Sequence, residues 1–477
     1  MSGNRQDTKL RIAGDLVETG EWIEVLNPYD QSPVGRIAAA DADLVERAVA
    51  SAKAAFDRGD FEQWQRADAL DQAARLLSER VDAFAETLAL EAGKPIKQAR
   101  VEAERAVGTL RFSADEARRL AGEMVPMEGG PAGAGKLGFV LRVPLGVVGA
   151  ISPFNFPLNL VAHKLGPAIA AGCPVVLKPA SATPLSGAAL VELLIEAGVP
   201  SDWLHVVAGP GAQTGDPLVD SPDVAAISFT GSVPVGWKIR SRAPRKRVML
   251  ELGSNAPLII CSDGDWKTAA DKASVHGYTH AGQSCISTQR VIVHESIAEE
   301  FTARLVAGVE ALKVGDPLDP ATDVGPLIDP GERERVHGWI EAAVASGAKL
   351  LTGGGVNPDG TLQPTVLDGG SDTDEVWVGE LFGPVTVIRR FAGFDDAVEM
   401  ANDSAYGLQA GVFTSDLATT LRAARELDYG GVMINEVPTF RTDQQPYGGV
   451  KDSGNTKEGP HWSVKEFTEE RLISVQA

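Results

Sequence analysis

Cys285 is the residue of this chain whose surroundings best suit nucleophilic chemistry. It lies in HAGQSCISTQR, a polar stretch with a nearby glycine. Cys173 and Cys261 lie in or beside apolar runs, where a cysteine usually serves as a small buried hydrophobe. An odd number of widely spaced cysteines without a CxxC pair argues against a disulfide scaffold and against structural zinc. Because a thiol with an ordinary pKa of about 8.5 is mostly protonated at pH 7, a catalytic Cys285 needs a base or a positive field nearby.

Two further residues have the chemistry to support such a nucleophile. Glu251, in MLELGS, ends an apolar run between two leucines. Partial desolvation there raises a carboxyl pKa toward the range of a general base, although strand-end acids are usually just exposed. Asn155, in SPFNFPLNL, offers an uncharged N–H donor on a stiff loop, which suits an oxyanion, although asparagine more often forms a turn.

Two other stretches are typical of nucleotide binding. FTGSVPVG, residues 229–236, follows the apolar run VAAIS and opens an expected helix, whose first N–H groups can bind an anion. Trp237 and Lys238 stand where a Walker-type loop requires lysine and then serine or threonine, which argues against that loop. Lys178, in PVVLKPAS, ends a buried strand where open α/β sheets bind ligands; it can hold ribose hydroxyls or a phosphate, and a merely solvated lysine is the equal alternative.

These residues require α/β domains to position them. A chain of 477 residues is too long for one ordinary core, so at least two domains are expected. From residue 147 to about 253, the apolar runs VVGAI, PVVLK, WLHVV, VAAIS and RVMLE alternate with stretches long enough for helices. This alternation predicts a doubly wound parallel sheet covered on both faces. It restarts near residue 258 and runs to about 435, which predicts a second α/β domain.

The amino-terminal quarter is expected to be helical. Residues 43–58 carry apolar side chains at helical spacing, with Asp43 as N-cap and Gly59 as the stop. Two more helices are predicted at about 65–93 and 96–121. At the other end, LISVQA predicts a short strand.

The charge balance restricts the partners. A formal net charge of −21 makes nucleic acid and anionic membranes poor partners. The amino-terminal MSGNRQDTKLRIAGD lacks the apolar centre of a signal peptide, and no apolar run approaches about 18 residues. We therefore expect a cytoplasmic protein without a bound metal.

Taken together, the motifs resemble the NAD(P)-dependent aldehyde dehydrogenase superfamily over nearly the whole chain. The spacing of Glu251 and Cys285 also fits the family pattern. The matching stretches, in family order, are SPFNFPL, VVLKPA, FTGS, LELGS, GQSC, ELFGPV and PYGGVKDSG. The segment INEVPTFRTDQQPYGGVKDSGNTKEGP is similar to the branch that acts on lactaldehyde, glyceraldehyde 3-phosphate, phosphonoacetaldehyde and sulfolactaldehyde.

The resemblance implies an α/β architecture of three parts. A Rossmann-like cofactor-binding domain would comprise residues 1–121 and 145–253, and a catalytic domain residues 254–452. Residues 122–144 and 466–477 would form a small β arm for assembly into a homodimer or homotetramer.

The resemblance also implies a role for each motif residue. Cys285 would convert the aldehyde into a thiohemiacetal and then a thioester, while Asn155 and the Cys285 N–H hold the oxyanion. Glu251 would activate the water that releases the acid. Lys164, in VAHK, matches a supporting lysine of the family, and a surface helix lysine is the alternative. The residues implied to bind NADP or NAD are Ile151, Phe154, Lys178, Ser181, Gly211, Phe229, Gly231, Ser232, Leu252, Glu380 and Phe382.

Two departures from the family pattern bear on the cofactor. After KPA many NAD-preferring members carry glutamate, which accepts a ribose 2′-hydroxyl and repels a 2′-phosphate, whereas this chain has Ser181. We therefore expect NADP to be accepted. Ser254 replaces the second glycine of the ELGG motif, a change that we expect to be tolerated.

The nature of the aldehyde is suggested by charged residues at substrate-tunnel positions. Arg105, His163 and Arg441 fall where relatives that oxidise hydrophobic aldehydes often carry apolar or aromatic residues. Cations facing an apolar tail are costly to desolvate, so we expect an aldehyde with an anionic or polyhydroxy tail. The other residues implied to line the tunnel are Phe156, Ser284 and Tyr447.

Two other functions stay open at this stage. A CoA-acylating aldehyde dehydrogenase uses the same cysteine and cofactor, but such relatives commonly lack the base that Glu251 supplies. A non-catalytic protein with this fold would have no need to retain Cys285, Glu251 and Asn155.

Overall fold

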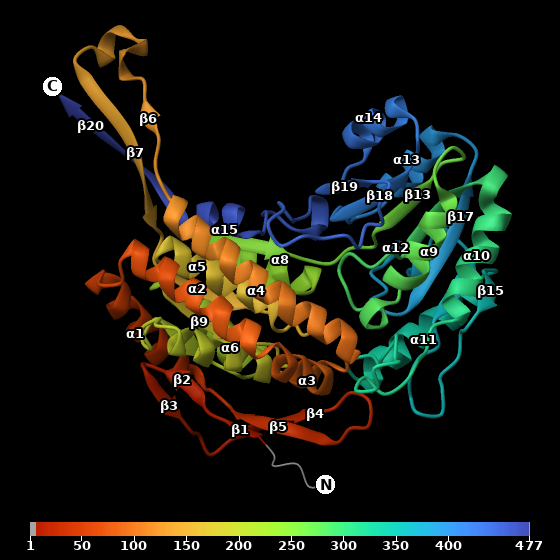
Figure 1. Cartoon of the computed structure of the whole chain (residues 1–477), viewed down its shortest axis with the longest axis horizontal. Coiled ribbons are helices and arrows are strands. Elements are labelled where there is room, and N and C mark those ends of the chain that lie inside the picture. The colour runs from red at the N-terminus through yellow and green to blue at the C-terminus, as the bar shows by residue number, and fades with distance from the viewer. Residues whose placement is uncertain (1–5, 477) are drawn as a thin grey trace.

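The first domain is built on a five-stranded sheet in which every neighbouring pair is parallel. The computed structural model describes residues 6–476, and Figure 1 shows its elements. The strand order is β10-β9-β8-β11-β12. The bounds are β8 Val147–Ile151, β9 Val175–Lys178, β10 Leu204–Val206, β11 Val224–Thr230 and β12 Arg247–Glu251. These are the five predicted runs, and the predicted α/β class is confirmed.

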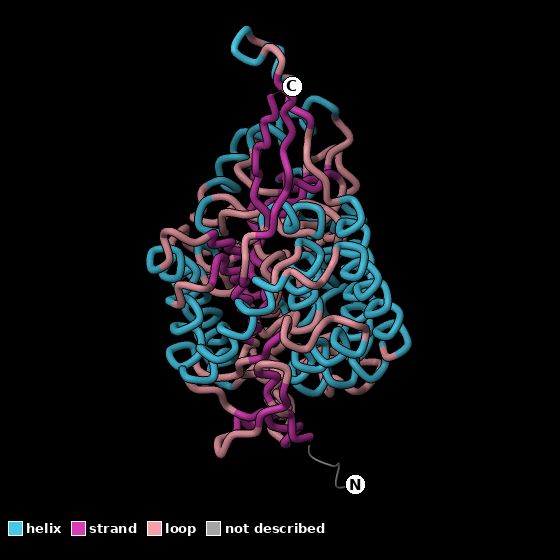
Figure 2. Tube along the Cα trace, turned by 90° about the vertical axis from the view of Figure 1, so that its left-hand side faces the viewer, coloured by secondary structure: helices cyan, strands magenta, loops and turns pink. Residues whose placement is uncertain are grey.

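Helices cover this sheet on both sides, as the end-on view shows (Figure 2). All 13 residues of α5 are buried, because α5 lies between the sheet and α4. Continuous burial of β8 and β9 explains why both read as unbroken apolar runs. The helices that follow the strands are α5 Asn159–Ala171, α6 Leu185–Glu196, α7 Asp216–Asp220 and α8 Val233–Arg242.

The second domain carries a seven-stranded sheet of order β15-β16-β17-β14-β13-β18-β19. Only β15 pairs in the antiparallel sense, so the second predicted α/β region is confirmed. Its strands are β13 Pro257–Ile260, β14 Arg290–His294, β15 Lys349–Thr352, β16 Thr365–Asp368, β17 Val385–Phe391, β18 Gln409–Phe413 and β19 Gly431–Ile434. Its helices are α9 Trp266–His276, α10 Ala298–Glu310, α11 Pro330–Ala345, α12 Glu375–Val378, α13 Phe394–Asn402 and α14 Leu417–Glu426.

The expectation of a wholly helical amino-terminal quarter is wrong for residues 6–38. These residues form strands of three to six residues, too short for any periodicity to mark them. They pair as a β1-β5-β4 sheet and a β2-β3 hairpin. Their bounds are β1 Gln6–Thr8, β2 Leu10–Ile12, β3 Asp15–Val17, β4 Trp22–Leu26 and β5 Pro33–Ala38.

The predicted helices exist, with two corrections. Asp41, not Asp43, caps the first helix, because its carboxylate accepts the N–H of Leu44 at 2.9 Å. Gly59 ends that helix at φ +60°, as predicted. The helix predicted over 65–93 is divided at Arg80. The four helices are α1 Ala42–Arg58, α2 Gln63–Glu79, α3 Val81–Ala92 and α4 Ile96–Arg119.

A three-stranded antiparallel sheet projects from the body of the molecule, at the upper left of Figure 1. The carboxyl-terminal strand follows α15 (Pro460–Glu466) and is longer than LISVQA suggested. The sheet exposes several large apolar side chains, namely Met124, Leu137, Leu141, Leu472 and Val475. Its strands are β6 Met124–Val125, β7 Lys136–Pro144 and β20 Thr468–Gln476. These strands fall within the two segments predicted to form the arm, whose assembly role stays a prediction.

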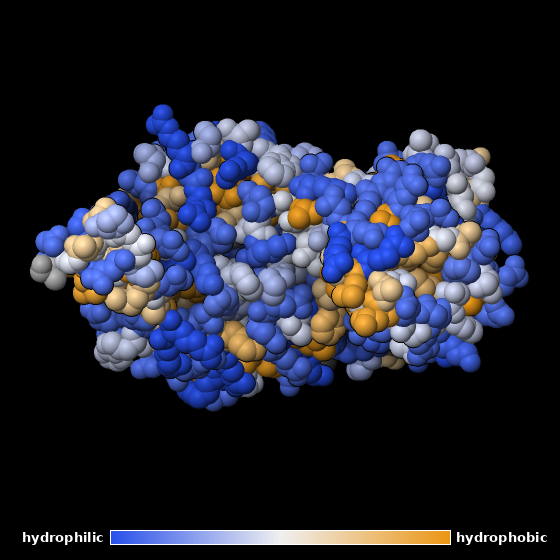
Figure 3. All heavy atoms as spheres, turned by 90° about the horizontal axis from the view of Figure 1, so that it is seen from above, coloured by the Kyte–Doolittle hydropathy of each residue, from blue (hydrophilic) through white to orange (hydrophobic). Residues whose placement is uncertain are grey.

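The surface seen from above is mainly hydrophilic with separate apolar patches (Figure 3). Within residues 6–476, none of the helices combines the length and the apolar character that a membrane crossing requires.

Candidate active site

Two cavities meet at Cys285. The first has a volume of about 640 Å³ and is lined mainly from α4, the residues around Cys285 and the 439–447 segment. The second has a volume of about 500 Å³ and is lined by the carboxyl ends of β8, β11 and β12 and by Glu380 and Phe382. Cys285 lines both cavities, so two different molecules can reach its sulfur from two directions.

A strained turn presents Cys285 at this junction. His280, Ala281 and Gly282 all have positive φ, between +51° and +72°. A side chain at Gly282 would place its Cβ 2.0 Å from the carbonyl oxygen of Gly383, so only glycine fits. The turn is tied down by Gln283, whose amide donates to the His280 carbonyl at 3.1 Å and accepts from the N–H of Ile328 at 2.8 Å.

The surroundings of the Cys285 thiol favour its protonated form. Burial raises its pKa to about 12, although the hydroxyl of Tyr447, 2.7 Å from the sulfur, and the nearby Arg441 oppose the shift. Arg441 and Tyr447 do not outweigh the effect of burial, so the reaction requires a group that takes the thiol proton.

This burial predicts an unusual pH dependence of alkylation. In ligand-free enzyme, reaction of Cys285 with iodoacetamide should rise by about tenfold per pH unit between about pH 7 and 10, because the thiolate fraction keeps growing below the raised pKa. Peptide mass spectrometry separates this cysteine from Cys173 and Cys261, whose pKa values burial also raises. An alkylation rate that levels off near pH 8.5 would show that the Cys285 thiol has an ordinary pKa and would contradict this prediction.

Glu251 ends β12 and is buried beside the second cavity. Neither of its carboxyl oxygens has a hydrogen-bond partner among residues 6–476. Burial raises the pKa of Glu251 well above its usual value, and the nearby carboxylate of Glu458 adds to the shift. A Cβ at Gly448, in the PYGG stretch, would lie 2.5 Å from Oε1 of Glu251, so this glycine leaves room for the carboxyl group. An unpartnered, desolvated carboxyl group beside a buried thiol is a suitable proton acceptor.

Lys164 is not on the surface, since its side chain is 1% exposed. Its ammonium donates to Thr230 Oγ1 at 2.7 Å and to Ser228 Oγ at 3.1 Å, and lies 3.8 Å from Glu458. Burial lowers the pKa of Lys164, and the charge of Glu458 opposes that shift. The ammonium group of Lys164 therefore lies close enough to Glu251 and Glu458 to interact with both carboxyl groups electrostatically.

Asn155 lies in the loop after β8 and lines the second cavity. Its side-chain N–H₂ donates to the carbonyl of Gln283 at 2.9 Å, and its Oδ1 accepts the N–H of Phe156 at 3.1 Å. The amide donor therefore points toward the segment that carries Cys285, two residues before the sulfur.

Most of the residues expected at the cofactor line the second cavity, namely Ile151, Phe154, Phe229, Gly231, Ser232, Leu252, Glu380 and Phe382. Gly231 and Ser232 bring the N-terminus of the ten-residue α8 to this cavity. A Cβ at Gly231 would lie 2.7 Å from the Phe229 ring, so the bare backbone is needed there. A helix N-terminus beside a cavity at the strand ends fits a dinucleotide pyrophosphate.

Three other expected cofactor residues do not line this cavity. The hydroxyl of Ser181 donates to the carbonyl of Gly209 at 3.2 Å, which connects the segment after β9 to the segment that leads to the exposed Gly211. Lys178 is 7% exposed, donates only to the carbonyl of Pro179, and has a pKa lowered by burial. These residues lie at the carboxyl ends of β9 and β10, along the same sheet edge as the cavity.

Five of the six expected substrate residues line the first cavity, namely Arg105, Phe156, Ser284, Arg441 and Tyr447. The placement of His163 in the tunnel is not borne out. Its imidazole lies behind the cavity wall, 3.2 Å from Asp443 and 3.3 Å from Thr109. Burial, with Arg441 nearby, lowers its pKa, so the ring is neutral. The sequence predicts that His163 lies on a helix, but it does not reveal the contact with the Asp443 carboxylate that holds the ring behind the cavity wall.

Each tunnel arginine has a carboxylate partner that sequence reasoning missed. Arg105 pairs with Asp443 at 2.8 Å, and Arg441 pairs with Glu458 at 2.8 Å. The carboxylates offset part of the positive charge expected there. Arg441 keeps one buried donor, Nε, without a partner. Only the folded chain shows these pairs, although acidic residues near Arg441 in FRTD and KEGP were a signal.

His280 was also missed as a candidate. It lines the first cavity, and both of its ring nitrogens are buried and find no hydrogen-bond partner in the described part of the chain. Burial, with Lys94 nearby, lowers its pKa well below the usual value. The imidazole is therefore neutral and has both a donor and an acceptor to offer.

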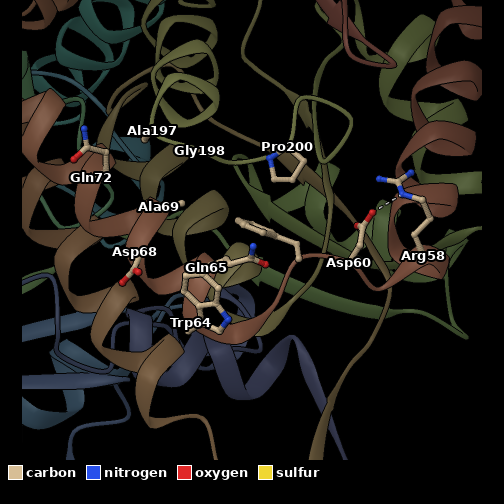
Figure 4. A pocket seen from close by; sticks show the side chains of 11 residues that line it. Arg58, Asp60, Trp64, Gln65, Asp68, Ala69, Gln72, Ala197, Gly198 and Pro200 are labelled. Atoms are coloured by element: carbon tan, nitrogen blue, oxygen red, sulfur yellow. Dashed lines mark hydrogen bonds and ion pairs between the residues drawn. The ribbon is translucent and has the colours of Figure 1, made fainter.

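A further pocket, of about 590 Å³, lies beside α2 and shares no residue with the two cavities (Figure 4). It is flanked by Trp64, Asp68 and Gly198, and its only cation, Arg58, is paired with Asp60. Its lining among the described residues includes no cysteine, serine, histidine or lysine, and its two carboxylates are those of Asp60 and Asp68.

Comparison with known proteins agrees with this geometry. Residues 16–473 match the aldehyde dehydrogenase family. A 3-sulfolactaldehyde dehydrogenase of Priestia megaterium is 47% identical over 465 residues, which cover 97% of each chain. The structure of aldehyde dehydrogenase 21 from Physcomitrella patens, in complex with the reaction product succinate, matches with a TM-score of 0.96 and 35% identity over 99% of each chain.

A structure with bound cofactor is also similar. Glyceraldehyde-3-phosphate dehydrogenase GapN from Methanocaldococcus jannaschii, complexed with NADP, has a TM-score of 0.92 and 36% identity, covering 96% of this chain and 100% of that one. The protein therefore belongs to the aldehyde dehydrogenase family and is an NAD(P)-dependent oxidoreductase.

Proposed function

We propose that this enzyme oxidises a short aldehyde with an anionic or hydroxylated tail to the carboxylic acid, with Cys285 as nucleophile. One observation carries the proposal: the Cys285 side chain lines both a cavity at the strand ends and a cavity whose lining includes Arg105 and Arg441. The named relatives support the substrate class, since sulfolactaldehyde and glyceraldehyde 3-phosphate each combine a small aldehyde with an anionic group.

In the proposed mechanism the sulfur of Cys285 attacks the carbonyl carbon and the thiol proton passes to Glu251. The electron pair of the C=O bond moves to oxygen, where the Asn155 amide and the Cys285 N–H stabilise it. NAD(P)⁺, when bound, supplies the hydride acceptor that makes this an oxidation. Glu251, once it has lost that proton, takes another from a water molecule, whose oxygen attacks the thioester. The carbon–sulfur bond breaks, the sulfur takes the proton from Glu251, the acid leaves, and the Cys285 thiol is restored.

Water is proposed as the acyl acceptor because Glu251 is present and buried beside Cys285. Adding CoA should then yield no acyl-CoA above the background of free-thiol exchange.

We further propose that the exposed apolar strands of the arm join subunits into a dimer or tetramer. The three unpaired cysteines fit a reducing compartment such as the cytoplasm.

The cofactor proposal assigns the adenosine ribose to Lys178 and Ser181, with Gly211 beside the phosphates. Ser181→Glu is then expected to lower kcat/KM for NADP⁺ by at least about tenfold, because a carboxylate repels the 2′-phosphate. The value for NAD⁺ should stay within about threefold, since the same carboxylate can accept the 2′-hydroxyl. Ser181→Gln, of equal size and without charge, is the matched control. Equal losses with both cofactors in Ser181→Glu would contradict the assignment.

The substrate proposal assigns the anionic tail to Arg441. Arg441→Met should lower the preference for succinic semialdehyde over pentanal, measured as a ratio of kcat/KM values, by about 10- to 100-fold, the equivalent of one or two charged hydrogen bonds. Lys97→Met is the control, because Lys97 lines the same cavity but is half exposed and paired with Asp323. An unchanged ratio, or a wild-type enzyme that prefers pentanal, would count against an anionic tail.

A further inference from the structure

A buried ion pair lies beneath the loop that carries Asn155. Lys94 follows α3, Glu102 is on α4, and each side chain is 1% exposed. The ammonium of Lys94 donates to the carboxylate of Glu102. Two charges removed from water cost several kcal/mol each unless further hydrogen bonds satisfy them, so their other partners show what the pair holds.

Those partners all belong to the loop and the helix next to it. The ammonium of Lys94 also donates to the backbone carbonyl of Asn155 at 2.7 Å. Oε1 of Glu102 accepts the N–H groups of Leu158 at 3.0 Å and Asn159 at 3.1 Å, at the N-terminus of α5. The pair therefore fixes the chain at Asn155 and again three residues later.

Two neighbours of Lys94 restrict it further. Its Nζ lies 3.8 Å from the centroid of the Phe156 ring, within the same loop. Gly93, at φ +65°, has no space for a side chain, because a Cβ would lie 2.8 Å from Pro326. The backbone carbonyl of Pro326 accepts a hydrogen bond from the side-chain amide of Gln283. The backbone carbonyl of Gln283 in turn accepts one from the side-chain amide of Asn155. Contacts therefore lead from Asn155 to Lys94, from the neighbouring Gly93 through Pro326 to Gln283 in the turn before Cys285, and from Gln283 back to Asn155.

We propose that Lys94 and Glu102 are positioning residues that hold the Asn155 amide toward the reacting carbonyl at Cys285. The inference rests on the proposed oxyanion role of Asn155. Both side chains line the first cavity, but within the described part of the chain their hydrogen bonds go to each other and to the backbone on either side of the amide, and none goes to Cys285. A displacement of about 1 Å in such a donor can cost about 100-fold in rate.

The first variant removes both charges together. Lys94→Met with Glu102→Gln keeps the side-chain volumes and an acceptor for the α5 N–H groups, so it leaves no unpaired buried charge. We expect kcat to fall about 10- to 100-fold, with kcat/KM falling equally, as for an interaction made only in the transition state. A native kcat in the folded double variant overturns the proposal.

The second measurement asks whether the loss acts through Asn155. Asn155→Ala alone should lower kcat about 10²- to 10³-fold. In that background the Lys94→Met, Glu102→Gln pair should lower kcat less than about twofold further, because the positioned group is already gone. An equal loss in both backgrounds overturns the inference and leaves the role of Asn155 intact. A native rate in Asn155→Ala overturns both proposals at once.

Two controls separate positioning from folding. Glu91→Gln changes another buried glutamate that accepts two N–H groups at a helix N-terminus, those of Leu185 and Ser186. It should alter Tm and leave kcat unchanged. If the double variant does not fold, Lys94→Arg keeps the charge but replaces the compact ammonium with a planar guanidinium. It should show the same dependence on Asn155, and its failure to do so overturns the proposal.

Discussion

Replacing Cys285 by alanine is expected to lower aldehyde-dependent formation of NAD(P)H by about 10⁴-fold or more, the size of loss seen when a catalytic nucleophile is removed. The reason is that no other thiol, among the described residues, lies at the junction of the two cavities. The measurement is absorbance at 340 nm with saturating cofactor and the best aldehyde.

The control for this variant is Cys261→Ala. Cys261 is buried at the end of β13, and burial raises its pKa as well, but it lines neither cavity. Its replacement should leave kcat within about threefold, since a lost buried thiol affects packing rather than chemistry. A native rate in Cys285→Ala would contradict the proposed nucleophile.

Replacing Glu251 by glutamine is expected to give the second-largest effect, a loss of about 10²- to 10⁴-fold in steady-state kcat. Glutamine has the same shape but cannot accept the proton of the water that attacks the thioester. If acylation survives with another proton acceptor, stopped-flow absorbance should show a burst approaching one NAD(P)H per site before turnover slows. A native steady-state rate in this variant would contradict the role of Glu251.

The wild-type enzyme offers a related test of Glu251 by pH. Because burial raises the pKa of this carboxyl group, the base is lost to protonation at a higher pH than an ordinary glutamate, whose pKa is about 4.3. The value of kcat should therefore fall as the pH is lowered, with its midpoint above that ordinary value. Glu251→Gln should lack this acidic limb.

Much of the fold could be predicted because parallel strands buried on both faces leave a strong signal. The runs VVGAI and PVVLK are wholly apolar until Lys178, and they form β8 and β9. The strands before residue 39 left no such signal, since each is short and partly exposed. Asp41 was missed as a cap because Asp43, two residues later, is equally able to cap in sequence terms.

Two of the catalytic candidates were accessible from sequence because one ends a strand and the other follows one. Glu251 is the last residue of β12, and Asn155 follows β8, so parallel topology brings them to one edge of the sheet. Their partners were not accessible in this way. Asp443 pairs with Arg105, and Glu458 approaches Lys164, across long separations that no local pattern records, whereas Arg441 and its partner Glu458 are 17 positions apart.

The paired arginines change the argument about the substrate. Sequence reasoning treated Arg105 and Arg441 as cations that required an anionic ligand. In the folded chain, Asp443 and Glu458 already satisfy part of that requirement. The position of both arginine pairs beside the cavity therefore supports a polar tail, and the measured preference between an anionic and a neutral aldehyde decides how much charge it carries.

The most direct test of the account is to trap the acyl group. Glu251→Gln enzyme, mixed with NADP⁺ and the best aldehyde at about pH 9, where hydroxide can accept the thiol proton in place of Glu251, and quenched in acid, should carry the mass of one acyl group on the peptide that contains Cys285. The adduct should be absent without NADP⁺ and removed by hydroxylamine, as a thioester is. Covalent catalysis at Cys285 would be contradicted if the wild type formed product but this variant never carried the adduct. An adduct on another residue would contradict it as well.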